Sequence, residues 1–141
     1  MLNPEQKIAK DRLISYLNST SENRIILTGS GGTGKTFTIS QVMSDLNKLL
    51  KLSAVIDSTK VNYRPWYFSA TTNKAKQAIQ RCLPNQEVDT IHSLLGLRPF
   101  RGHLTKSKNF TSKLSPGSIL VIDEASYIDD KLLSFIISSV K

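Results

Sequence analysis

The residues with the clearest chemical potential form a glycine-rich octet, Gly29-Ser30-Gly31-Gly32-Thr33-Gly34-Lys35-Thr36, which matches G-x-x-x-x-G-K-[ST] at every fixed position. A triphosphate needs several converging backbone N–H donors, and glycines let the backbone approach it without an obstructing Cβ. Lys35 would add a positive charge at the β- and γ-phosphates, and Thr36 a hydroxyl for Mg²⁺. The octet predicts a phosphate-binding loop whose candidate ligands are Gly29, Gly31, Gly32, Thr33, Gly34, Lys35 and Thr36.

A second chemical pattern is the acidic pair Asp123-Glu124, which ends the apolar run Ile119-Leu120-Val121-Ile122. Such a run is typical of a central parallel strand, whose carboxyl end delivers side chains to a site. Alone, an acidic pair at a strand end is more often a solvated edge or a helix cap. Together with the phosphate loop, it predicts that Asp123 holds Mg²⁺ opposite Thr36, through water, while Glu124 orients or deprotonates the attacking water. Lys35, Asp123 and Glu124 are the candidate catalytic residues.

The segments that must position these residues alternate between strand and helix signals. Residues 24–28 are a β-branched run that predicts a strand entering the loop, and apolar residues recur at helical spacing from Ile39 to Leu50. Residues 66–70 predict a second strand, and Asn73 is a plausible cap for a helix from Lys74 to about Cys82. The expected fold class is α/β with a mostly parallel sheet, in one domain covering residues 1–141.

The ends and connections carry weaker signals. Asn3 and Pro4 predict the start of a helix, in which Gln6 either completes a capping box or recognises adenine. Residues 52–64 form an ambiguous connection, and residues 90–96 a short apolar turn or helix closed by Gly96. Residues 97–117 predict a basic exposed hairpin or loop. Asp129 is expected to cap a last helix.

Composition bounds the class of protein. The 141 residues are 39% hydrophobic and 21% charged, which is ordinary for a soluble domain. No run approaches the roughly 18 apolar residues of a membrane span, and the first residues lack signal-peptide character, so we expect a cytoplasmic protein without membrane contact. Cys82 is the single cysteine and there are two histidines, which argues against a disulfide framework or a zinc site.

The charge is unevenly distributed. The formal net charge is +8, and residues 60–113 contain ten basic residues against two acidic ones, Glu87 and Asp89. This excess predicts a polyanionic partner, although a solvated basic face would give the same composition. Trp66, Tyr67 and Phe68 fit core packing better than base stacking, whereas Phe100 and Phe110 are expected to be exposed.

Five segments of the chain, taken in order, resemble the motifs of superfamily-1 helicases of the RecD and Dda-like branch. Residues 2–6 resemble the glutamine motif, residues 29–36 motif I, and residues 69–75 motif Ia. Thr90-Ile91-His92-Ser93-Leu94-Leu95 resembles motif Ib, and Asp123-Glu124-Ala125-Ser126 motif II. The motif Ib match separates helicases from other P-loop ATPases. Thr71 stands where the family usually has Pro, and Tyr127 where it often has Met.

The resemblance implies a RecA-like three-layer sandwich that binds ATP and Mg²⁺, with Gln6 on adenine. It implies contacts to single-stranded DNA, with RNA also open, by the candidate residues Thr72, Asn73, Lys74, His92, Arg98 and Arg101. The last two fall in the stretch that corresponds to a strand-separating pin. The family continues with a second RecA-like domain and its arginine, so we expect residues 1–141 alone to bind ATP weakly and not to unwind DNA.

Two other classes of function remain open from the residues. A nucleotide-dependent switch or loader would use the loop and the acidic pair to remodel proteins without moving along a strand. A non-catalytic nucleic-acid-binding remnant would bind DNA and no nucleotide. Stimulation of ATP hydrolysis by single-stranded DNA would favour a translocase over both.

Overall fold

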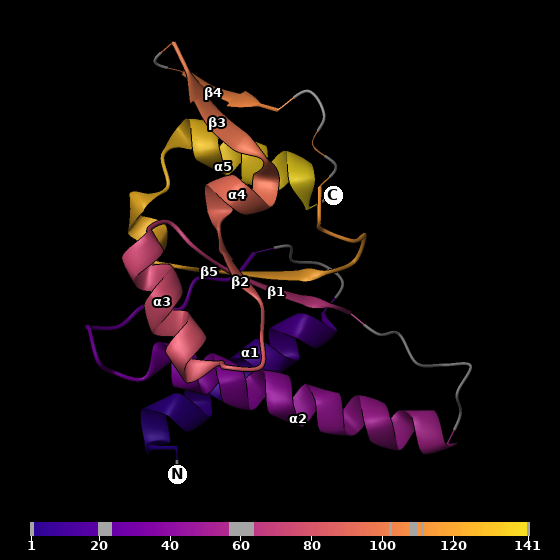
Figure 1. The fold of residues 1–141 in the computed structure, drawn as a ribbon. Helices are drawn as coiled ribbons and strands as arrows, with labels where there is room; N and C mark the ends of the chain where they lie inside the picture. Colours follow the sequence, from indigo (N-terminus) through magenta and orange to yellow (C-terminus); the bar gives the residue numbers. More distant parts are fainter. Residues whose placement is uncertain are drawn as a thin grey trace. The chain divides into compact units, whose positions relative to one another are not determined.

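Two helices flank the glycine-rich loop in the computed structural model, which describes residues 2–19, 24–56, 64–101, 103–107, 110 and 112–140 (Figure 1). Helices α1 (Pro4–Asn18) and α2 (Lys35–Ile56) pack on each other within the first of two compact units, Met1–Tyr63. The predicted helix start is confirmed, because Pro4 begins α1 and Asn3 caps it. Lys10 Nζ lies 3.0 Å from Asp45 Oδ2 and ties the two helices together.

The strand predicted for residues 24–28 is wrong, because residues 24–30 form neither strand nor helix. A strand needs a neighbour with which to exchange backbone hydrogen bonds. The described part of the first unit offers only helices beside this segment. The side chain of Ile26 is 82% exposed, so this β-branched segment does not pack against a hydrophobic core as a strand normally would.

Helix α2 extends further than its apolar pattern predicted. It continues to Ile56 and so includes residues 52–56 of the predicted connection. These five residues contain no Gly or Pro, so nothing in them ends the helix. Residues 57–63 of that predicted connection lie outside the described residues. Although α2 has 22 residues, none of the helices that the structure describes is long and apolar enough to cross a membrane.

A parallel sheet organises the second unit, Arg64–Lys141. Its strands β1 (Trp66–Ala70), β2 (Val88–Thr90) and β5 (Ile119–Asp123) run in the order β2-β1-β5. Both pairings are parallel, and Ala70 lies opposite Asp123 in the register. The strands predicted at residues 66–70 and before Asp123 are confirmed, while β2 was missed because three residues carry no periodic signal. The parallel sheet with its helices confirms the α/β class.

Helices cover the sheet of the second unit and form its core. These are α3 (Asn73–Cys82), α4 (Ile91–Leu95) and α5 (Asp130–Ser139), with a short 3₁₀ helix η2 (Ala125–Tyr127) after β5 (Figure 1). The predicted cap Asp129 accepts a hydrogen bond from the first turn of α5, and Thr90 does the same for α4. The main buried cluster combines residues of α4 and α5 with Leu97, which follows Gly96, and it consists of Ile91, Leu94, Leu95, Leu97, Leu132 and Ile136.

The basic hairpin predicted between residues 97 and 117 is confirmed in its first half. Strands β3 (Leu97–Phe100) and β4 (His103–Lys106) pair antiparallel directly after α4. Its base is anchored on Gly96, whose carbonyl accepts the Ser107 N–H at 3.0 Å. The ring of Phe110 lies where a Cβ on Gly96 would stand, so the expected exposure of Phe110 is wrong, and the side chain is half-buried.

Substituting alanine for Gly96 should therefore destabilise the protein more than the same change at Gly117. Both residues have positive φ, 64° and 74°, but only Gly96 has neighbours within 4 Å of an added Cβ. Gly117→Ala should cost about 1 kcal/mol of unfolding free energy from backbone strain alone, and Gly96→Ala about 3 kcal/mol because the Phe110 ring must also move. Urea unfolding of both variants measures the difference. Equal losses would show that Phe110 does not depend on Gly96.

Candidate nucleotide and nucleic-acid sites

The backbone of the glycine-rich loop turns sharply at two of its glycines. Gly32 and Gly34 have φ values of 75° and 82°, which only glycine adopts without strain. Open space surrounds Gly31 and Gly32, since no atom lies within 4 Å of a Cβ built on either. Gly34 is different, because its added Cβ would lie 2.6 Å from Gln6 Nε2. The loop is thus open on one side and packed against α1 on the other.

Lys35 closes the loop on itself. Its Nζ donates hydrogen bonds to the carbonyls of Gly29, at 2.8 Å, and Ser30, at 3.0 Å. The Thr33 hydroxyl donates to the same Ser30 carbonyl at 2.9 Å. A phosphate oxygen is a stronger acceptor for an ammonium group than a neutral carbonyl is. The Lys35 ammonium group can therefore exchange its hydrogen bonds to the carbonyls for hydrogen bonds to an anion that enters the loop. The residues present therefore fit a nucleotide phosphate, with the half-buried Thr36 in the first turn of α2 available to Mg²⁺.

Gln6 connects the first helix to this loop. Its Oε1 accepts the Asn3 N–H at 3.0 Å, and its Nε2 donates to the Thr33 carbonyl at 2.9 Å. The capping box predicted as one of two readings of Gln6 is confirmed. The contact with Thr33 adds a second structural role that the local sequence could not indicate, since 27 positions separate the two residues. Recognition of adenine by Gln6 stays a prediction.

The acidic pair lies at the carboxyl end of β5, in the second unit. Asp123 Oδ1 accepts the N–H of Glu124 at 2.9 Å. Glu124 has φ 55° and ψ 41°, a left-handed conformation that is uncommon outside glycine and concentrates at functional sites. The Glu124 carbonyl accepts the Thr71 hydroxyl at 3.4 Å, and its Oε2 accepts the Thr72 hydroxyl at 3.3 Å. The ends of β1 and β5 are thereby linked through side chains.

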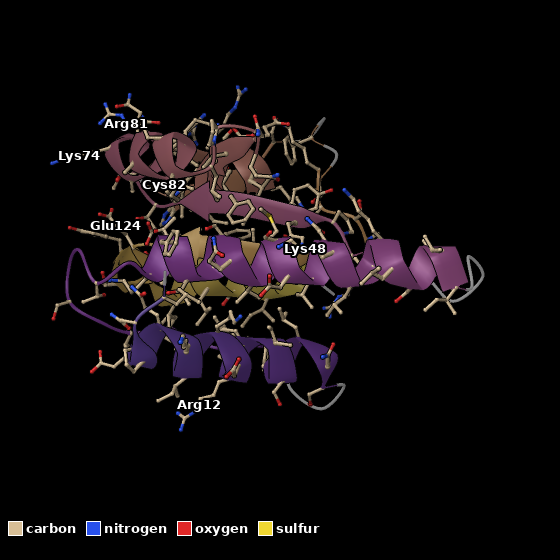
Figure 2. All side chains as sticks on the ribbon, turned by 90° about the horizontal axis from the view of Figure 1, so that it is seen from below. Arg12, Lys48, Lys74, Arg81, Cys82 and Glu124 are labelled. Atoms are coloured by element: carbon tan, nitrogen blue, oxygen red, sulfur yellow. The ribbon has the colours of Figure 1, made fainter. Side chains whose placement is uncertain are left out.

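The same threonine begins helix α3. The predicted cap Asn73 is wrong by one residue, because Thr72 has extended backbone and its Oγ1 accepts the Ala75 N–H at 3.1 Å. Both residue types cap helices, and β1 ends two residues earlier, which places Thr72 at the turn. Asn73 and Lys74 are exposed in the first turn of α3, and Figure 2 shows Lys74 and Glu124 at the same end of this unit. The structure thus brings Thr72, Asn73, Lys74, Asp123 and Glu124 together.

The remaining candidate residues for nucleic acid lie elsewhere in the second unit. His92 is half-buried on α4, and Arg98 and Arg101 are exposed on the β3–β4 hairpin. The other positions of the Thr-Ile-His motif are structural, since Thr90 caps α4 and Ile91, Leu94 and Leu95 are buried.

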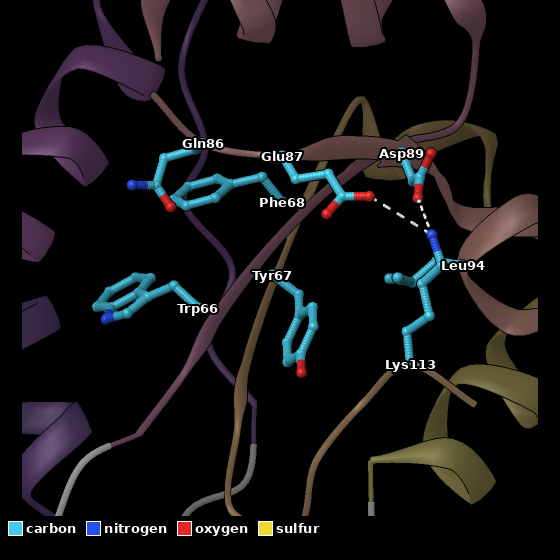
Figure 3. A pocket seen from close by; sticks show the side chains of 8 residues that line it. All are labelled: Trp66, Tyr67, Phe68, Gln86, Glu87, Asp89, Leu94 and Lys113. Carbon is cyan, nitrogen blue, oxygen red and sulfur yellow. Dashed lines mark hydrogen bonds and ion pairs between the residues drawn. The ribbon is translucent and has the colours of Figure 1, made fainter. Parts of the chain in front are cut away.

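A cavity of about 160 Å³ lies at the β2 edge of the sheet and contains none of the predicted site residues (Figure 3). It is lined by Trp66, Tyr67, Phe68, Gln86, Glu87, Asp89, Leu94 and Lys113. Lys113 Nζ lies 3.0 Å from Asp89 Oδ2 and 3.5 Å from Glu87 Oε1, and Lys76 Nζ lies 3.3 Å from Asp89 Oδ1. Two cations of the basic stretch are therefore engaged by carboxylates of the same chain.

The Asp89 ion pairs should make stability depend on pH. Burial acts to raise the pKa of Asp89, but the hydrogen bonds and positive charges of Lys113 and Lys76 outweigh it and lower that pKa. The contribution is therefore present above the unfolded pKa of about 3.9 and is lost as pH falls through the native value. Asp89→Asn should cost roughly 1 kcal/mol of unfolding free energy at pH 6, and this cost should shrink as pH falls below the unfolded pKa of Asp89.

Urea unfolding across that pH range measures the Asp89 effect. Glu87→Gln is the matched control, because the Glu87 side chain is 84% exposed and shares the same lysine. A loss for Asp89→Asn that is independent of pH would contradict the ion-pair explanation.

A glycine-rich loop followed by Lys-Thr at a helix start, and acids at the end of a half-buried parallel strand, define a P-loop NTPase with a RecA-like α/β fold. The chain belongs to the AAA domain family, whose model matches residues 15–141. P-loop domains of this kind generally use ATP and Mg²⁺.

Two relatives match most of the chain. It is 26% identical over 152 residues to an uncharacterized protein of Acanthamoeba polyphaga mimivirus, over 94% of this chain and 28% of that protein. It is 28% identical over 127 residues to the RecBCD enzyme subunit RecD of Haemophilus influenzae, over 82% of this chain and 19% of that protein. The chain spans less than a third of the length of either relative. The resemblance to RecD-like helicases is confirmed.

Proposed function

We propose that the chain is the ATP-binding motor domain of an ATP-dependent DNA helicase, which couples ATP hydrolysis to movement along single-stranded DNA and to duplex unwinding in the full-length protein. One observation carries the proposal. The candidate hydrolytic residue Glu124 is hydrogen-bonded to Thr72, at the start of the segment proposed to contact the strand. Such a contact would let a bound strand influence the hydrolytic residue directly, which supports a nucleic-acid-driven motor.

The proposed nucleotide chemistry divides among five side chains. Gln6 contacts adenine, Lys35 binds the β- and γ-phosphates, and Thr36 and Asp123 hold Mg²⁺. The metal, when bound, neutralises charge on the β- and γ-oxygens. Glu124 orients the attacking water and accepts its proton. The loop backbone of residues 29–34 supplies N–H donors to the phosphates, supported by the open space at Gly31 and Gly32.

The proposed strand contacts use the start of α3 and the basic hairpin. Exposed Asn73 and Lys74 offer a donor and a cation at a helix N-terminus, which favours a phosphate. His92, Arg98 and Arg101 extend the contacts over α4 and the β3–β4 hairpin, which would act as the strand-separating pin. Binding of this kind depends on charge, so it should weaken steeply with salt and show little sequence preference.

Steady-state ATP hydrolysis, measured on the protein encoded by the complete reading frame with and without oligothymidylate, tests the proposal. Stimulation by the oligonucleotide supports a translocase. ATP hydrolysis that ignores the oligonucleotide contradicts it in favour of a switch or loader, and strand binding without nucleotide binding contradicts it in favour of a remnant. A parallel titration with oligouridylate decides between DNA and RNA.

A further inference from the structure

The cavity beside β2 lies at the amino end of the parallel sheet. Its walls include Trp66, the first residue of β1, and Gln86 and Glu87, which directly precede β2. Because β1, β2 and β5 run parallel, this end of the sheet is opposite to the acidic pair at the end of β5. We propose that the cavity binds the guanidinium group of an arginine side chain that a partner polypeptide presents.

Aromatic rings form the apolar part of the cavity wall. The Trp66 ring stacks on the Phe68 ring, with centroids 6.1 Å apart and planes inclined by 12°, and Phe68 is buried. The Tyr67 hydroxyl lies 3.1 Å from Ser115 Oγ. Both half-buried rings are thus held in place before a ligand arrives, which lowers the entropic cost of binding. The volume of about 160 Å³ admits one flat group of about the size of a benzene ring.

One carboxylate at this cavity can accept further hydrogen bonds. Asp89 is engaged at both oxygens, by Lys76 Nζ at 3.3 Å and by Lys113 Nζ at 3.0 Å. Glu87 Oε1 accepts a hydrogen bond from Lys113 at 3.5 Å, which is long for a charge-assisted bond. Within the described part of the chain, no hydrogen bond reaches Glu87 Oε2. The Glu87 side chain is 84% exposed, so a group that enters from solvent can reach this oxygen.

A guanidinium group matches both kinds of wall, which Figure 3 draws together. It is flat and weakly hydrated, so it can stack on the Trp66 or Tyr67 ring while its N–H fork donates to the Glu87 carboxylate. An ammonium group is more strongly hydrated and has no flat face. A phosphate would be repelled by Glu87, and the two lysines near the cavity are already paired with Asp89. The chemistry therefore favours an arginine of a polypeptide over a nucleic acid.

Trp66 is the single tryptophan of the 141-residue chain, so its fluorescence reports directly on this cavity. Titration with N-acetylarginine amide at constant ionic strength should change the emission in a saturable way, with a Kd of about 5 mM for one side chain. N-acetyllysine amide should bind about fivefold more weakly. N-acetylcitrulline amide has the same shape without the charge, and it should bind at least about tenfold more weakly.

The Glu87→Gln variant tests the proposed partner of the guanidinium group. The amide keeps the size of the carboxylate and loses its charge, so the Kd for N-acetylarginine amide should rise about fivefold. The melting temperature should not change, because the Glu87 side chain is exposed. Asp130→Asn is the matched control, since it removes the same charge from an exposed acid of the second unit that does not line the cavity. It should keep the wild-type affinity.

Four results would overturn the inference, and none of them bears on the ATPase assays. The first is an emission change that does not saturate by about 50 mM arginine compound. The second is equal binding of the arginine and citrulline compounds, and the third is equal affinity of the wild type and Glu87→Gln. The fourth is displacement of the arginine compound by oligothymidylate, which would assign the cavity to nucleic acid. If Glu87→Gln does not fold, the citrulline comparison on the wild type decides.

Discussion

Lys35→Ala is expected to lower ATP turnover by at least about 10³-fold and to weaken ATP binding, because it removes the one cation that the phosphate loop itself provides. The ammonium group already lies over the loop, 2.8 Å from the Gly29 carbonyl and 3.0 Å from the Ser30 carbonyl. An alanine cannot replace either that charge or those donors. Isothermal titration with an ATP analogue and a steady-state ATPase assay measure the two effects separately.

Lys48→Ala is the matched control for this experiment. Lys48 lies on the same helix, its side chain is 73% exposed, and its ammonium group lies 3.9 Å from Asp45, a surface ion pair of little energetic value. It should keep wild-type turnover. Because Lys35→Ala also loses two hydrogen bonds within the loop, its unfolding free energy must be measured alongside. A folded Lys35→Ala protein with near wild-type turnover would contradict the role of the loop.

Local signals predicted the parts of the fold that depend on neighbours in sequence. The capping residues Asn3 and Asp129 were predicted because a helix start is decided within four residues. The strand at residues 24–28 failed for the opposite reason, since a strand exists only with a partner, which the sequence does not name. The three residues of β2 are a strand because β1 lies beside them.

The candidate site divides in the same way. The phosphate loop is a continuous octet, so its residues could be named from spacing alone. The contact between Thr72 and Glu124 joins residues 52 positions apart, and it depends on the register that sets Ala70 beside Asp123. The cap predicted at Asn73 was one residue late because the end of β1 at Ala70 sets where the turn falls. The position of the Thr72–Glu124 contact follows from the pairing of β1 with β5, which the sequence alone does not specify.

Glu124→Gln is expected to keep ATP and Mg²⁺ binding while turnover falls by about 10²- to 10³-fold. The amide has the size of the carboxylate and its oxygen can still accept the Thr72 hydroxyl, so the fold of the site should persist. What it loses is the ability to take a proton from water. Nucleotide titration and single-turnover hydrolysis measure binding and chemistry independently.

The neighbouring Asp123→Asn variant should fail differently, and the contrast tests the division of roles between the two acids. The amide oxygen of the Asp123→Asn variant can still accept the Glu124 N–H, but a neutral ligand holds Mg²⁺ more weakly than a carboxylate does. Raising the Mg²⁺ concentration should therefore restore part of the turnover of Asp123→Asn. It should not restore the turnover of Glu124→Gln. Asp129→Asn is the control, because Asn caps α5 as well as Asp does and the residue lies outside the site. If metal rescues both variants equally, the acids share one role and Glu124 is not the proton acceptor.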